Sequence, residues 1–320
     1  MLFNSLLNPG HSSCAGCGEI LAMRHVLDAA GSNTIIVNAT GCSEVTTSKF
    51  PTSSFKVPWI HANFENASAV AAGVWAALKT KRKILRGSSR FTSGLAPQDD
   101  KQKQAQDDKA GKINVMAWGG DGAFFDIGFG LLSGSWERGE NILHVCFDNE
   151  AYMNTGVQAS GATPFSANTT TTPPDTNSFG NELMKKDMIA IALAHRCVYA
   201  GTATIANVVD IENKVKKALT LAGPKYLQIL VTCVPGWYTD AKDTIKIARL
   251  AQQTGVYPVV EFVNGELLDA VKCPVPRPKV EEYLKLQGRY KHLFKSDKGQ
   301  VIIKKIQSMA DENMEKYNLQ

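Results

Sequence analysis

The sequence lacks any long apolar run. No stretch in its 320 residues approaches the ~20 apolar residues of a membrane-spanning helix. Residues 1–7 are too few for a secretory signal peptide and lack its basic start. The net charge of +5 is dispersed, because basic residues do not cluster with aromatic ones and acidic residues are mixed among them. We therefore expect a cytoplasmic protein that binds neither membranes nor nucleic acid.

Cysteine is also scarce, and the odd count of seven argues against a disulfide framework. Four of the thiols stand in loops marked by glycine or next to the end of an apolar run: Cys14, Cys17, Cys42 and Cys233. The residues alone leave three interpretations open: a redox dithiol of Cys14 and Cys17, a zinc ion with four thiolates, or a [4Fe–4S] cluster. Cys146 and Cys197 lie in or beside apolar runs and are expected to be buried and inert.

Two apolar runs end in residues that suit phosphate and metal binding. Gly120-Asp121-Gly122 follows the run 113–118, and Asp148-Asn149-Glu150-Ala151 follows the run 142–147. Carboxylate, amide and carbonyl oxygens are ligands of Mg²⁺, and glycine lets a phosphate approach the backbone. Alone, Gly-Asp-Gly is more often a tight turn. At the carboxyl ends of parallel strands, the same residues would hold a diphosphate.

Apolar strands that alternate with helical segments predict an α/β fold: a parallel sheet with helices on both faces. We expect residues 1–255 to form this domain, with a polar, exposed and mobile insertion at 86–111. Residues 256–320 are expected to be a C-terminal extension that packs on a partner subunit and is helical from Gly299 onward.

The spacing of the two loops resembles the fingerprint of thiamine diphosphate-binding enzymes. The 26 residues from Ala123 to Asp148 separate the Gly-Asp-Gly sequence from Asn149. This resemblance implies the thiamine diphosphate-binding fold. It also implies that Asp121, Asn149 and the carbonyl of Ala151 hold Mg²⁺.

Over nearly its whole length the chain resembles the β subunits of 2-oxoacid:ferredoxin oxidoreductases, with the pyruvate enzyme (pyruvate synthase) as the nearest type. The motifs that carry this resemblance are residues 10–19 (GHSSCAGCGE), 40–42 (TGC), 58–61 (PWIH), 64–67 (FENA), 120–122 (GDG), 148–158 (DNEAYMNTGVQ), 233–237 (CVPGW), 280–284 (VEEYL) and 287–289 (QGR).

The resemblance assigns Cys14, Cys17, Cys42 and Cys233 to one [4Fe–4S] cluster close to the thiamine. Asn154 and Glu19 are implied to be catalytic, with Asn154 reaching toward the thiazolium and the substrate carbonyl. The implied cofactor-binding residues are Glu19, Cys42, Gly120, Asp121, Gly122, Ala123, Asn149, Ala151, Tyr152 and Asn154. From its position alone, Glu19 is equally a helix-start carboxylate favoured by the helix dipole.

The implied reaction is the thiamine-dependent oxidative decarboxylation of pyruvate, or of a related 2-oxoacid, with coenzyme A. Electrons would pass through the cluster to ferredoxin. The resemblance implies an α subunit that supplies the thiamine-activating glutamate and much of the substrate pocket. It also implies γ and ferredoxin-like δ subunits, or a fused equivalent.

Three alternatives remain. The same kind of enzyme could act on 2-oxoisovalerate, 2-oxoglutarate or oxalate. A non-redox thiamine enzyme subunit would need Asp121 and Asn149 but not the four cysteines. A zinc-stabilised interaction protein would need only the cysteines.

Overall fold

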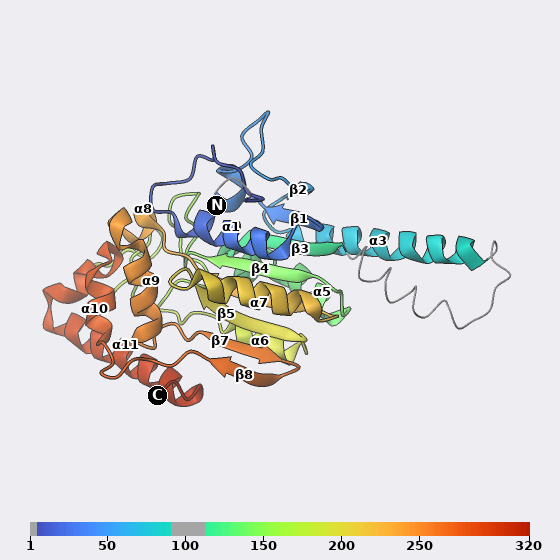
Figure 1. Ribbon diagram of the computed structural model, residues 1–320. Helices are drawn as coiled ribbons and strands as arrows, with labels where there is room; N and C mark the ends of the chain where they lie inside the picture. The colour runs from blue at the N-terminus through green and yellow to red at the C-terminus, as the bar shows by residue number, and fades with distance from the viewer. Residues whose placement is uncertain (1–4, 91–112) are drawn as a thin grey trace.

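The structure, a computed structural model, describes residues 5–90 and 113–320. Its centre is an 8-stranded sheet with the strand order β2-β1-β3-β4-β6-β5-β7-β8 (Figure 1). The first six strands in this order are parallel to one another, and β7 and β8 are antiparallel additions. The strands are β1 (Thr34–Ala39), β2 (Trp59–Ala62), β3 (Asn114–Gly120), β4 (Leu143–Asp148), β5 (Tyr199–Thr204), β6 (Lys225–Leu230), β7 (Val260–Val263) and β8 (Glu266–Ala270).

Helices cover both faces of this sheet, which confirms the predicted fold class. On one face, α1 (Gly18–Ala30) and α7 (Val208–Thr220) pack against apolar strand residues, and both lie in front of the sheet in Figure 1. On the other face lie α3 (Ala67–Arg90), the π-helix η2 (Gly122–Ile127), α5 (Phe129–Glu137) and α6 (Met188–Ala194). The central strands β4, β5 and β6 are buried at every position, as expected for a parallel sheet between two helical layers. No helix in the two described ranges has the length and apolar character needed to cross a membrane.

The parallel strands bring distant loops to one edge of the sheet. Gly120 of β3 pairs with Phe147 of β4, and Asp148 of β4 pairs with Leu230 of β6. The residues that follow these strand ends therefore become neighbours. The same edge receives the short helix α2 (Cys42–Val45) after β1 and the short helix α8 (Val234–Trp237) after β6. The fold thus brings together the loops that carry the predicted cofactor-binding and cluster residues.

The start of α1 is fixed against the end of β6. The Gly18 amide donates to the Thr232 carbonyl oxygen over 3.1 Å. A Cβ on Gly18 would lie 2.7 Å from the Thr232 amide nitrogen, so only glycine fits this contact. Because Cys17 precedes Gly18 and Cys233 follows Thr232, this contact holds two of the predicted cluster cysteines near each other.

The C-terminal residues differ from the predicted separate extension. From residue 256 onward the chain adds β7 and β8 to the same sheet, with β7 paired to β5. Its remaining elements pack with α9 (Thr244–Gln253), α8 and Leu230 in one apolar cluster: α10 (Val280–Lys285), the 3-10 helix η4 (Gly288–Lys295) and α11 (Asp297–Lys316). A further 3-10 turn, η3 (Ala241–Asp243), leads into α9. Contact of this segment with a partner subunit stays a prediction.

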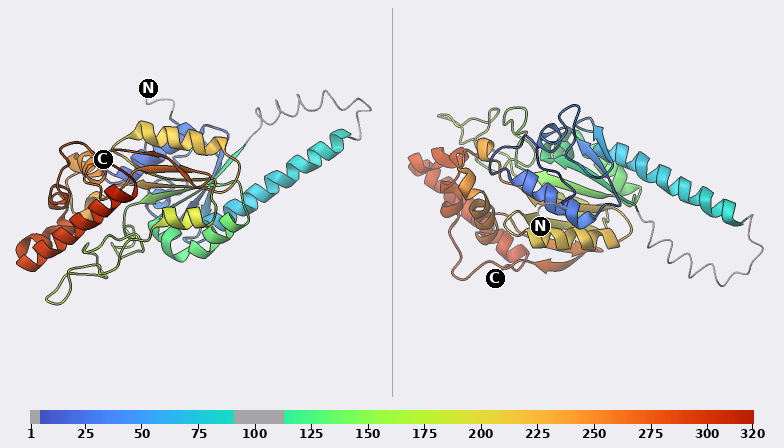
Figure 2. Two further views of the ribbon diagram at one scale, coloured as in Figure 1. Left: turned by 90° about the horizontal axis from the view of Figure 1, so that it is seen from below. Right: turned by 45° about the horizontal axis from the view of Figure 1, so that its top comes forward.

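The polar insertion at 86–111 is described only in its first residues. Helix α3 continues through Arg90, so residues 86–90 are helical rather than part of a structureless loop. Residues 91–111 lie outside the described residues, and the prediction that they are exposed and mobile stays untested. Helix α3 projects from the body of the molecule at the end opposite α11 (Figures 1 and 2).

The contact between Gly18 and Thr232 generates a prediction. Replacing Gly18 by alanine should lower the free energy of unfolding by about 1–3 kcal/mol, the usual cost of forcing a methyl group into a packed contact. Thermal denaturation of the purified protein measures this change. Gly73→Ala is the matched control, because a Cβ there meets nothing within 4 Å and α3 gains a better helix former. Equal stability of the two variants would contradict the close contact.

Candidate active site

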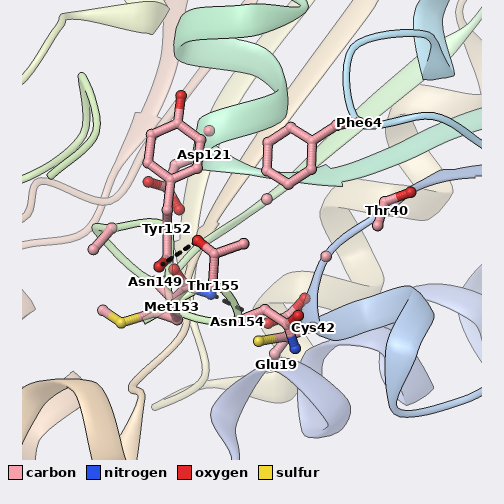
Figure 3. A pocket seen from close by; sticks show the side chains of 14 residues that line it. Glu19, Thr40, Cys42, Phe64, Asp121, Asn149, Tyr152, Met153, Asn154 and Thr155 are labelled. Atoms are coloured by element: carbon pink, nitrogen blue, oxygen red, sulfur yellow. Dashed lines mark hydrogen bonds between the residues drawn. The ribbon is translucent and has the colours of Figure 1, made fainter. Parts of the chain in front are cut away.

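A pocket opens at the carboxyl edge of the sheet, where the loops with the predicted site residues meet. It is lined by Glu19, Thr40, Gly41, Cys42, Phe64, Gly120, Asp121, Gly122, Asn149, Ala151, Tyr152, Met153, Asn154 and Thr155 (Figure 3). These residues come from the start of α1 and from the loops after β1, β2, β3 and β4. Nine of the ten predicted cofactor-binding residues are among them. The exception is Ala123, whose side chain is buried in the apolar core beside the pocket.

Three polar groups meet in the wall of this pocket: the Asp121 carboxylate, the Asn149 side-chain amide and the Ala151 carbonyl. With its amide nitrogen toward the other two groups, Asn149 donates to the Asp121 Oδ1 atom over 3.0 Å and to the Ala151 carbonyl oxygen over 2.7 Å. With its amide oxygen toward them, the three oxygen atoms surround a position that a cation would fill. Adjacent ligands of an octahedral Mg²⁺ ion, at 2.0–2.1 Å each, stand about 2.9 Å apart. The arrangement fits the ligand set predicted from the sequence.

The backbone of this loop is arranged so that one carbonyl is left for a ligand. The carbonyl oxygen of Asn149 accepts from the Trp237 indole over 2.8 Å, and that of Glu150 accepts from the Thr163 hydroxyl over 2.8 Å. Glu150 adopts a left-handed backbone conformation with φ 69°, which is uncommon for a non-glycine residue. The turn at Glu150 brings the Ala151 carbonyl round to the Asn149 side chain.

Asp121 is deeply buried, and among the described residues it forms no ion pair, although the charge of Lys185 acts on it. Asp121 is only 1% exposed, and its Oδ2 atom accepts a short hydrogen bond from the Ser160 hydroxyl. Burial, followed by the nearby charge of Asp148, raises the pKa of Asp121 well above its usual range. A bound divalent cation would remove this penalty. Ser160, which the sequence analysis missed, orients the carboxylate.

The two glycines beside Asp121 serve different purposes. A Cβ on Gly120 would meet only the Phe147 carbonyl oxygen, at 3.9 Å, so Gly120 leaves open space on the pocket wall. A Cβ on Gly122 would lie 2.3 Å from the Tyr152 ring. The Tyr152 hydroxyl in turn donates to Asp126 over 3.1 Å, which fixes the ring across the loop. Gly122 is therefore required by the packing of Tyr152, and not only by a phosphate.

A second group of side chains lines the pocket beside the start of α1. Glu19 is buried, and burial raises its pKa to about 7. Its Oε2 atom accepts a hydrogen bond from the Asn149 amide over 3.3 Å. Figure 3 shows Glu19, Cys42 and Asn154 side by side, and the Asn154 side chain is hydrogen-bonded to the Cys42 thiol. The two predicted catalytic residues therefore lie together, beside a predicted cluster ligand.

The four predicted cluster cysteines approach one another at this edge. Burial raises the pKa of Cys17 to about 11 and that of Cys233 to about 12, and each of these pKa values is raised further by the charges of Glu19 and Cys14. Burial also raises the pKa of Cys42, and Glu19, Cys233 and Cys17 add to the shift. Each thiolate in this group would raise the pKa of its neighbours. A bound cationic group would therefore stabilise the thiolate forms of these cysteines.

These thiols are not arranged around a single ion. In the described residues, no three histidine, cysteine, aspartate or glutamate side chains are close enough to hold one metal ion. A [4Fe–4S] cluster spreads its thiolates more widely, because each sulfur binds a different iron. Cys146 and Cys197 are buried in the apolar core, as predicted, and Cys273 is buried near the C-terminus.

The sequence analysis missed several residues of the pocket. Thr40, Gly41, Phe64, Met153 and Thr155 line it but were not assigned to it. All five belong to motifs that were recognised in the sequence, so their position in those motifs was the available signal. The Phe64 ring stacks on the Tyr152 ring with centroids 5.7 Å apart, which ties the loop after β2 to the loop after β4.

Comparisons with known proteins identify the family to which the chain belongs. Residues 102–229 match the family model described as thiamine pyrophosphate enzyme, C-terminal TPP binding domain. The chain is 47% identical to the pyruvate synthase subunit PorB of Methanosarcina barkeri, covering 98% of this chain and 97% of that protein. It is 40% identical to the ketoisovalerate oxidoreductase subunit VorB of Pyrococcus abyssi, covering 90% and 86%.

A solved structure shares the fold. The 2-oxoglutarate:ferredoxin oxidoreductase from Magnetococcus marinus, with 2-oxoglutarate, coenzyme A and succinyl-CoA bound, superposes with a TM-score of 0.56. The alignment covers 94% of each chain at 19% identity, so this likeness concerns the fold.

The two glycines of the pocket give a paired prediction. Gly122→Ala should lower the stability of the cofactor-free protein by about 1–3 kcal/mol, because the new methyl group collides with the Tyr152 ring. Gly120→Ala should leave that stability unchanged, because its Cβ enters open space. Thermal denaturation without cofactor compares them. An equally destabilised Gly120→Ala would show that this wall of the pocket is not open.

Proposed function

Since the chain belongs to the family of PorB and VorB subunits of 2-oxoacid:ferredoxin oxidoreductases, we propose that its pocket binds thiamine diphosphate through Mg²⁺. We propose also that Cys14, Cys17, Cys42 and Cys233 hold a [4Fe–4S] cluster beside it. The enzyme is an oxidoreductase, and this chain is the subunit with the thiamine diphosphate-binding fold.

The observation that carries the magnesium proposal is that the Asp121 carboxylate, the Asn149 side-chain amide and the Ala151 carbonyl meet at one point. These residues lie at the carboxyl ends of β3 and β4, the usual ligand edge of an open α/β sheet. The buried carboxylate of Asp121 is without an ion-pair partner in the described residues, which favours a cation as its missing partner.

The cluster proposal is supported by the gathering of four thiols from three separate segments. Cys17 and Cys233 flank the contact between Gly18 and Thr232, and Cys42 begins the helix after β1. Glu19 and Asn154 lie between these thiols and the metal loop. A bound thiamine would supply an electron sink for decarboxylation, and the neighbouring cluster would accept electrons.

The roles of the chain's own residues follow from their positions. Asp121, Asn149 and Ala151 would fix the diphosphate end of the cofactor. Glu19, buried with its pKa raised to about 7, would face the cofactor in an environment that keeps water out. The Asn154 amide, on the loop above Cys42, would donate to the substrate carbonyl.

The substrate proposal is pyruvate, with 2-oxoisovalerate as the second candidate. The relatives named for pyruvate and for ketoisovalerate are similarly related to this chain, at 40–47% and 39–40% identity. The matched PorB and VorB proteins are named as subunits, so we propose an assembled enzyme. An α subunit would supply the activating glutamate, and γ and ferredoxin-like δ subunits would carry electrons to ferredoxin in the cytoplasm.

Crossed substitutions test the two cofactor sites separately. Asp121→Ala should abolish Mg²⁺-dependent binding of thiamine diphosphate, measured by calorimetry, and leave the iron and sulfide content of the anaerobically purified complex unchanged. Cys233→Ser should lower the iron and sulfide content and leave thiamine diphosphate binding intact. Cys273→Ser is the matched control for both, since this buried thiol is placed outside the cluster. A colourless wild-type complex that contains zinc would overturn the cluster proposal.

A substrate panel tests the reaction. The wild-type complex should show a visible absorption band that bleaches when pyruvate and coenzyme A are added together. Specificity is judged from kcat/KM for pyruvate, 2-oxoisovalerate, 2-oxoglutarate and oxalate. A kcat/KM at least tenfold higher for 2-oxoisovalerate would identify that compound, rather than pyruvate, as the substrate. If none of the four 2-oxoacids bleached the band, the proposed function would be contradicted.

A further inference from the structure

The motif Gln287-Gly288-Arg289 is far from the metal loop in sequence but contacts it in space. Arg289 is only 2% exposed, and its Nη2 atom lies 2.6 Å from the Glu150 Oε2 atom. The guanidinium also stacks on the Trp237 ring, 3.8 Å from its centroid. The Arg289 Nε atom donates to the side chain of Gln287 over 2.9 Å, which fixes the orientation of the group.

The two partners of Arg289 hold consecutive residues of the metal loop. Trp237 donates its indole N–H to the Asn149 carbonyl oxygen, and Glu150 is the residue with the left-handed backbone. On its other carboxylate oxygen, Glu150 accepts from Lys185 over 2.9 Å, and Lys185 also pairs with Asp148 over 2.5 Å. Two buried carboxylates are thus balanced by the buried Arg289 and by Lys185, whose side chain is 21% exposed, as buried charges require.

We propose that Arg289 is a positioning residue for the metal loop. Through Glu150 and Trp237 it maintains the turn at residues 149–151 that directs the Asn149 side-chain oxygen and the Ala151 carbonyl to one point. This inference rests on the proposed magnesium and thiamine diphosphate site. It gives the C-terminal segment 256–320 a part in the active site, although none of its residues lines the pocket.

The geometry requires a guanidinium and not merely a positive charge. One planar group donates to Glu150 and lies over the Trp237 ring, with its Cζ atom 3.8 Å from the ring centroid. A lysine ammonium is a point charge without a face to stack, so it can pair with Glu150 but cannot hold Trp237 in place. Arg289→Lys therefore separates positioning from charge balance.

The experiment measures Mg²⁺ binding by calorimetry on the full complex, at saturating thiamine diphosphate. Arg289→Lys should weaken the Mg²⁺ affinity at least tenfold. Excess Mg²⁺ should restore kcat, while the Mg²⁺ concentration for half-maximal activity stays raised. Arg277→Lys is the matched control in the same segment, because Arg277 pairs with Asp311 away from the pocket, and it should bind Mg²⁺ like the wild type.

A second variant keeps the test informative if Arg289→Lys does not fold. The double substitution Glu150→Gln with Arg289→Met removes both buried charges together, and should fold and show the same weakened Mg²⁺ affinity. If the variant that folds binds Mg²⁺ within twofold of the wild type, or only its melting temperature falls, Arg289 is structural and the inference is overturned. If the wild type itself binds thiamine diphosphate without Mg²⁺, the proposed function fails, and the inference with it.

Discussion

The arrangement of the loops at the carboxyl edge of the sheet depends on the balance of buried charge there. Asp121, Asp148, Glu150 and Glu19 are all buried within or beside the loops that follow β3 and β4 and the start of α1. Lys185 and Arg289 neutralise Asp148 and Glu150. Asp121 and Glu19 have no such partner in the described residues, and burial raises the pKa of both. A buried, uncompensated carboxylate is costly, so each of these acids either takes up a proton or needs a nearby cation, such as the Mg²⁺ proposed beside Asp121.

This charge balance explains why the C-terminal segment belongs to the domain. Residues 280–295 form a small apolar cluster with α8, α9 and α11, and that cluster carries Arg289 inward. Helix α8 is shared between the two proposed cofactor sites, because Cys233 stands at its start and Trp237 at its end. A displacement of this one short helix would therefore move a cluster thiol and the Asn149 carbonyl together.

Much of the fold and of the pocket followed from the sequence. The apolar runs 113–118 and 142–147 predicted strands of a parallel sheet, and nine of the ten expected cofactor-binding residues line one pocket. Ala123 does not, because its side chain turns into the core. The Pro-rich stretch 274–278 predicts an extension, but β7 and β8 precede it and join the sheet. Strand pairing with β5 is a non-local interaction that no local pattern records.

The sequence by itself determined which atoms are available: the carboxylate of Asp121, the amide of Asn149, and thiols in loops where glycine allows close approach. These depend on residue type and on strand periodicity, which are local properties. Only the tertiary structure decided that Ser160 orients Asp121, that Gly122 makes room for the Tyr152 ring, and that Arg289 reaches Glu150. Such contacts join residues up to 139 positions apart, and their geometry is set by the packing of whole elements.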